Sequence, residues 1–244
     1  MHVCKNCGNR FEGKYCSNCR QSADTRRITW HELAHQVPHV LFHADRGLVH
    51  TILELVKRPG HSIREYIEGK RADHFNPLMF LLLSGGTASL LFFGLHLPLP
   101  VKEIRIEQIE SLGPSLSHKY FAVVGFLFIL LLAITDFFFY RIQKLVLPEI
   151  IVSNTFQAGQ IMVFTIAMVP LLYIQQVIEN RYGTVIEMRY VLKATVLVFL
   201  FSTRYQLYGA KGKPLLVTKI ILQLLLVYAI YNFFITGLMI KLLQ

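Results

Sequence analysis

Charged residues are scarce in this chain of 244 residues: Asp, Glu, Lys and Arg make up 16% of it, whereas 53% is hydrophobic. A soluble domain carries about 25% charged residues, so the composition argues against a soluble protein and predicts a membrane protein. The charges that are present are unbalanced, with 25 Lys and Arg against 15 Asp and Glu. In a membrane protein this excess indicates anionic lipid as the partner, and nucleic-acid binding is the less favoured interpretation.

Signals of export and of catalysis are also missing. The chain begins MHVCKNCGNR, without the apolar segment of a signal peptide. It has no Gly-rich phosphate loop, and Ser84-Gly85-Gly86 follows an apolar stretch rather than the strand that a nucleophile elbow requires. We therefore assign no catalytic residue and expect a protein that is not an enzyme. Gly85-Gly86 instead predicts close packing between helices.

Cysteine occurs only near the N-terminus, in two Cys-x2-Cys pairs separated by eight residues: Cys4, Cys7, Cys16 and Cys19. Two such turns complete the tetrahedron of thiolates that Zn²⁺ prefers, and Gly8 and Gly13 suit the tight turns involved. A unit of about 20 residues cannot bury a stabilising core, so the metal would supply its folding energy. The pattern predicts a structural zinc ribbon, with two disulfides or a redox pair as weaker alternatives. Phe11 and Tyr15 are expected to pack over the metal, although they can also stack on bases.

Amphipathic helices are predicted between the ribbon and the first long apolar stretch. The capping box Thr29-Trp30-His31-Glu32 predicts a helix from about Trp30, and Ser62-Ile63-Arg64-Glu65 predicts a short helix that ends near Gly69. Basic and aromatic residues alternate here, as is typical of helices in the lipid headgroup layer. The alternative is packing against the ends of membrane-spanning helices. The predicted headgroup contacts are Arg26, Arg27, Lys57, Arg58, Arg64, Lys70 and Arg71.

Four histidines recur at four-residue intervals in this region: His31, His35, His39 and His43. Neighbouring pairs share one helix face, so they can chelate a second metal or carry protons. The more conservative interpretation, which we favour, is a polar stripe of interfacial histidines.

Five apolar stretches are candidates for crossing a membrane, at about 20 residues per crossing: residues 77–97, 120–140, 156–178, 190–208 and 219–240. Lys193 and Arg204 interrupt the fourth, for which a re-entrant segment is the alternative to a full crossing. The predicted fold is an all-α polytopic membrane protein of about five transmembrane helices. Its expected domains are a zinc ribbon (1–22), interfacial amphipathic helices (23–75) and a transmembrane helical domain (76–244). The distribution of basic residues places the N-terminus in the cytoplasm.

Polar side chains within these stretches are costly in lipid and therefore candidates for function. They are Asp136, Gln157, Gln160 and Gln223. Such groups can line a solute or proton route, but more often they join helices by hydrogen bonds. Asp136 has Arg141 as a possible ion-pair partner five residues later.

Three segments carry a family resemblance: Cys-Lys-Asn-Cys-Gly with Tyr-Cys-Ser-Asn-Cys, then Arg-Pro-Gly-His-Ser-Ile-Arg-Glu-Tyr-Ile-Glu-Gly-Lys-Arg, then Asn-Pro-Leu-Met-Phe-Leu-Leu-Leu-Ser. Over residues 4–84 the chain resembles bacterial zinc-ribbon membrane proteins grouped as a domain of unknown function, numbered 3667, mainly from Bacteroidota. The resemblance implies the bacterial inner membrane but no activity.

Three functions follow as hypotheses. The first is a non-enzymatic membrane assembly, either a homo-oligomeric channel or an accessory protein whose zinc head couples to a cytosolic protein partner or signal. The second is a proton-coupled small-solute transporter that uses Asp136 and the histidine row. The third is a metal-dependent lipid-processing membrane enzyme. We favour the first, because no catalytic motif supports the third.

Overall fold

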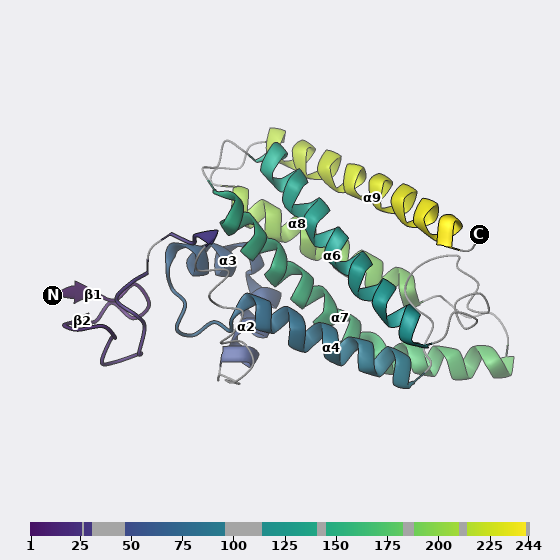
Figure 1. Cartoon of the computed structure of the whole chain (residues 1–244), viewed down its shortest axis with the longest axis horizontal. Coiled ribbons are helices and arrows are strands. Elements are labelled where there is room, and N and C mark those ends of the chain that lie inside the picture. Colours follow the sequence, from purple (N-terminus) through teal and green to yellow (C-terminus); the bar gives the residue numbers. More distant parts are fainter. Residues whose placement is uncertain are drawn as a thin grey trace.

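The computed structural model describes residues 1–25, 27–30, 47–95, 114–140, 145–182, 188–209 and 214–242. Two short strands form an N-terminal module (residues 1–25), and an elongated helical body follows it (Figure 1). The strands are β1 (His2–Val3) and β2 (Arg10–Phe11). The described helices are α2 (Gly47–Lys57), α3 (Pro59–Glu68), α4 (Pro77–Gly94), α6 (Pro114–Phe139), α7 (Leu147–Tyr182), α8 (Met188–Tyr208) and α9 (Pro214–Leu242).

The prediction of about five membrane-spanning helices is wrong. Among the described residues, one helix is long and apolar enough to cross a membrane, over Leu147–Gln175 of α7. Three other apolar stretches in this part of the chain are shorter, at 10–17 residues each: Pro77–Leu91, Leu127–Phe139 and Leu215–Ile230. A helical crossing needs about 20 residues, because each residue adds only about 1.5 Å along the axis. Counting apolar stretches in the sequence therefore overestimated the number of crossings.

The helix α7 lies at the centre of the body, in contact with α4, α6 and α8, and α9 packs against α6 and α8 (Figure 1). Aromatic and aliphatic side chains from several helices form one continuous core. Phe156 of α7 packs against Tyr66 of α3, with ring centroids 5.0 Å apart, and against Phe80 of α4. Leu207 of α8 and Ile220 of α9 belong to the same core.

The helix α3 starts earlier than its capping box predicts. It begins at Pro59, since proline favours the first helical position, and Ser62 is therefore inside the helix. It ends at Glu68, followed by Gly69 with a φ of 114°, in agreement with the predicted end near Gly69. Six of its ten residues are buried, and it packs against α8. For α3, the predicted alternative of packing against other helices is therefore present, and its position in the headgroup layer stays a prediction.

Gly60 lies where the backbones of α3 and α8 approach closely. A Cβ atom at this position would lie 2.4 Å from the Thr203 carbonyl oxygen and 2.5 Å from the Gln206 Cβ. The Gly60 N–H also donates to the Gln206 side-chain oxygen at 3.0 Å. Gly85 and Gly86 are not at such a contact: within the part of the chain that the structure describes, no atom would lie within 4 Å of a Cβ on either residue.

We expect Gly60→Ala to destabilise the protein by about 1–3 kcal/mol, since the α8 backbone cannot move away without disturbing the core. In a chain of this size, that corresponds to a fall of about 2–10 °C in the midpoint of thermal unfolding. Gly85→Ala is the matched control, which we expect to leave the midpoint unchanged or slightly raised. Equal midpoints for the two variants would contradict the close contact between α3 and α8.

Candidate metal centre and buried polar network

The four cysteines of the N-terminal module converge on one point. Their sulfur atoms all lie within 4.8 Å of one another, and none forms a disulfide. The Sγ atoms of Cys4 and Cys19 are 3.5 Å apart, and those of Cys7 and Cys16 are 3.6 Å apart. A tetrahedron with zinc–sulfur bonds of about 2.3 Å has sulfur–sulfur edges of about 3.8 Å. The four thiols therefore have the arrangement needed to hold a tetrahedral metal ion, and the alternative of two disulfides is wrong.

The two cysteine turns have the same backbone geometry. The Gly8 N–H donates to the Cys4 carbonyl, and the Arg20 N–H donates to the Cys16 carbonyl, both at 2.9 Å. Gly8 has a φ of 74° and Arg20, its counterpart, a φ of 62°. Backbone N–H groups in the second turn, first that of Cys19, lower the pKa of Cys16 to about 6. The turn therefore stabilises the thiolate form, which is the form that binds metal.

Of the two predicted aromatic contacts with this centre, one is present. Phe11 is buried against Cys4 and Cys16, whereas Tyr15 is exposed. The small core contains mainly the cysteines themselves, so a bound metal would supply most of the module's stability.

The side chain of Gln21 joins the N-terminal module to the helical body. It is buried, and its oxygen accepts the N–H groups of Arg71 at 3.1 Å and Ala72 at 2.7 Å. Its amide group donates to the Gly69 carbonyl at 3.0 Å. Gln21, which follows the last cysteine turn, thus forms three hydrogen bonds with the chain between α3 and α4. Nothing in the sequence distinguishes this glutamine from a solvated one.

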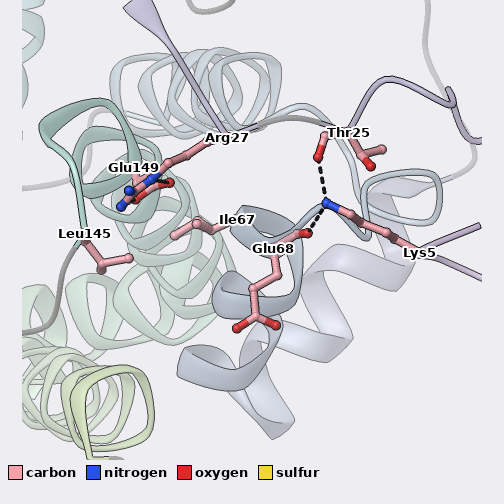
Figure 2. A pocket seen from close by; sticks show the side chains of 7 residues that line it. All are labelled: Lys5, Thr25, Arg27, Ile67, Glu68, Leu145 and Glu149. Carbon is pink, nitrogen blue, oxygen red and sulfur yellow. Dashed lines mark hydrogen bonds and ion pairs between the residues drawn. The ribbon is translucent and has the colours of Figure 1, made fainter.

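Two cations strengthen the same junction. Lys5 donates to the carbonyl oxygens of Thr25 at 2.8 Å and Glu68 at 3.2 Å. Arg27 forms a bidentate ion pair with Glu149 at the start of α7, with N–O distances of 2.7 and 3.0 Å. Figure 2 shows both contacts beside a cleft of about 290 Å³ whose lining includes Ile67 and Leu145. The module is thus fastened to the end of α3 by Lys5, and the chain just after the module is fastened to the start of α7 by Arg27.

The predicted headgroup contacts are largely engaged within the protein. Besides the Arg27–Glu149 pair, Arg58 pairs with Glu54 and Glu65, and Lys70 lies 3.6 Å from Glu65. Arg71 donates to the Tyr66 carbonyl and lies over the Tyr66 ring. Lys57 is exposed and Arg64 half-buried. Arg26 and the histidine row of His31, His35, His39 and His43 lie outside the described residues.

A second site lies inside the helical body, where Arg204 of α8 and Asp136 of α6 form an ion pair with no exposed surface. The Arg204 guanidinium also donates to Gln223 of α9 at 3.0 Å and to Gln157 of α7 at 2.9 Å. Asp136 accepts from Asn154 of α7 at 2.9 Å and from Gln223. Four helices are therefore joined by one polar network in an apolar interior.

The structure brings together three of the four polar residues predicted within the apolar stretches: Asp136, Gln157 and Gln223. Gln160 is also fully buried, but neither of its side-chain polar atoms has a hydrogen-bond partner. The ion-pair partner of Asp136 is Arg204, 68 positions later in the sequence, whereas the suggested partner Arg141 lies outside the described residues. Arg204, like Lys193, interrupts a mostly apolar stretch of α8, and the cost of such a charge in lipid was its only sequence signal.

The comparisons with known proteins concern the segment that connects the two sites. Residues 45–93 match the model of a family described as protein of unknown function (DUF3667). The predicted resemblance to this family is therefore confirmed over residues 45–93, a segment that does not include the four cysteines. The DUF3667 segment includes α2, α3, the residues bound by Gln21, and the described length of α4 up to residue 93. No curated protein and no solved structure matches the chain.

Proposed function

We propose that this protein is a non-enzymatic accessory protein of the bacterial inner membrane, which couples a cytosolic protein partner or signal to its helical body. The zinc-loaded N-terminal module is the part that binds this partner or responds to this signal. The observation that carries this proposal is the Gln21 joint, because three hydrogen bonds of one buried side chain connect the module to the chain after α3. From there α3 packs against α8, which carries Arg204 of the polar network.

Zinc is the metal that the donors favour. Four thiolates with near-tetrahedral spacing suit Zn²⁺, and four protein ligands leave no open position for a substrate. The residues that would hold it are Cys4, Cys7, Cys16 and Cys19. Its role is therefore to stabilise the module and keep the Gln21 joint in place.

The membrane location rests on α7 and on the outer surface of the helices around it. The apolar length of α7 is sufficient for a crossing. Large apolar side chains are exposed on neighbouring helices, among them Val198 of α8 at 69% and Leu225 of α9 at 60%. Exposed apolar surface on this scale is typical of contact with lipid acyl chains. We propose that α7 crosses the membrane with the N-terminal module on the cytoplasmic side.

The carrier hypothesis is less favoured by the geometry. A proton-coupled carrier needs an acid that exchanges protons with water, whereas Asp136 has no exposed surface and is held by Arg204, Asn154 and Gln223. A network whose members come from four helices is better suited to holding helices together.

Affinity capture from cytosol tests the proposed coupling. We expect the zinc-loaded protein to retain a cytosolic protein that Cys16→Ser releases. The control is Glu12→Gln, a change at an exposed position of the same module, which we expect to bind as the unmodified chain does. The same proteins bound by all three forms would contradict the proposal.

Flux through liposomes of anionic lipid tests the two transport hypotheses. We expect proton and small-solute flux equal to that of empty vesicles, for a zinc-loaded sample whose fold is verified by circular dichroism. Flux that Asp136→Asn abolishes would overturn the proposal in favour of a carrier, and flux that survives this change would favour a channel.

A further inference from the structure

We infer that His50 of α2 and His74, in the chain between α3 and α4, form a second metal site, for a divalent transition ion such as Ni²⁺ or Zn²⁺. It is separate from the cysteine centre and is made entirely from the DUF3667 segment. The two imidazole rings meet edge to face, with centroids 5.4 Å apart. Imidazole nitrogen is a preferred ligand of both ions.

The hydrogen bonds of His74 leave one nitrogen available as a ligand. Its Nε2 is 2.9 Å from the Ser62 hydroxyl oxygen, whereas its Nδ1 is buried and has no hydrogen-bond partner among the described residues. If Nε2–H donates to Ser62, Nδ1 carries the free lone pair. Metal-binding histidines have this arrangement, since a bond from the second nitrogen fixes the tautomer and the ring orientation. Ser62 is itself buried, so it holds the ring firmly.

The surroundings of the pair keep the His74 imidazole in the neutral form that binds metal. Burial and the neighbouring His50 lower its pKa, while Glu54 of α2, Glu65 of α3 and Asp73 beside it act in the opposite direction. Arg58 offsets part of the charge of these carboxylates by pairing with Glu54 and Glu65. His50 is exposed on the outer surface of α2, so an ion can enter from solvent and water can fill its remaining coordination positions. The predicted second site used the histidine row instead, which lies outside the described residues.

Calorimetric titration with Ni²⁺ tests this site in the full-length, tag-free protein, with the cysteine centre already filled by zinc. We expect His50→Asn to remove one bound Ni²⁺ per chain, and His74→Gln to remove the same one. Because His50 is exposed, its replacement leaves the fold intact, and zinc content verifies this. The control is His61→Asn, an exposed histidine of α3, which we expect to bind Ni²⁺ as the unmodified protein does.

The Ser62→Ala variant tests whether the bond between Ser62 and His74 contributes to metal binding, as expected for an organised metal site and not for two histidines that are merely close together. Loss of the bond to Nε2 is expected to weaken Ni²⁺ binding by about tenfold or more, since the partner of a ligating histidine has effects of that size. Ni²⁺ binding unchanged in His50→Asn and in His74→Gln would overturn the inference. Binding that depends on both histidines but not on Ser62 would overturn the assigned tautomer.

Discussion

Arg204→Met is expected to lower the free energy of unfolding by about 3–5 kcal/mol, the largest effect of any single replacement considered in the helical body. The change removes the cation and leaves the Asp136 carboxylate buried, with only Asn154 and Gln223 as donors. An uncompensated charge in an apolar interior is far more costly than the loss of the pair itself. Chemical unfolding of the full chain in detergent micelles, followed by circular dichroism, measures the difference.

The double variant Arg204→Met with Asp136→Leu tests the cause. It removes both charges, so we expect it to be more stable than the single Arg204→Met variant, despite carrying one more change. The matched control is Lys193→Met on the same helix, where the cation lies over the Tyr190 ring and is only half-buried. There we expect a loss of about 1 kcal/mol or less. If Lys193→Met were as destabilising as Arg204→Met, the special cost of the buried pair would be contradicted.

Cys16→Ser is expected to abolish metal binding at the cysteine centre and to unfold the N-terminal module. The thiolate most stabilised by its turn is lost, and three sulfur ligands cannot close the tetrahedron. Apparent binding free energies of structural zinc in small modules are about 10–16 kcal/mol, and the small core around Phe11 cannot replace them. Elemental analysis is expected to show one zinc per chain in the unmodified protein and none in the variant.

The control for this change is Glu12→Gln, in the same module, which is expected to keep its zinc. Limited proteolysis provides a second readout: cleavage of Cys16→Ser within residues 1–25 should leave the helical body intact, because its core does not include the cysteines. A Cys16→Ser variant that still binds one zinc as tightly would disprove the four-thiolate centre.

The sequence was sufficient for sites whose residues are close together or chemically unusual. The spacing of the cysteines predicts their convergence, and polar residues in apolar stretches identify Asp136, Gln157 and Gln223 before any contact is known. The start of α3 was mispredicted because Pro59 at the first helical position outweighed the capping box at Ser62. All these predictions rest on local sequence signals. Such a prediction fails where two local signals compete, as Pro59 and Ser62 do at the start of α3.

Contacts between distant segments had no such signal. Arg204 is a costly interruption of an apolar helix until the fold places Asp136 beside it. In the sequence, Gln21 looks like any other polar residue. Only the fold shows that two N–H groups and a carbonyl just after α3 are its hydrogen-bond partners. The number of crossings was overestimated for a related reason, since apolar residues that form a core between packed helices have the same composition as those that face lipid.

Hydrogen exchange at the backbone amides of residues 69–72 tests the central claim most directly, that the metal-loaded module is fastened to the helical body. Three forms of the full chain in lipid nanodiscs are compared: zinc-loaded, zinc-free, and zinc-loaded Gln21→Ala. We predict slow exchange in the first and faster exchange in the other two, because the Arg71 and Ala72 N–H groups lose the Gln21 oxygen. Equal exchange in all three forms would contradict the account, since the module would then be attached to the body only through the chain.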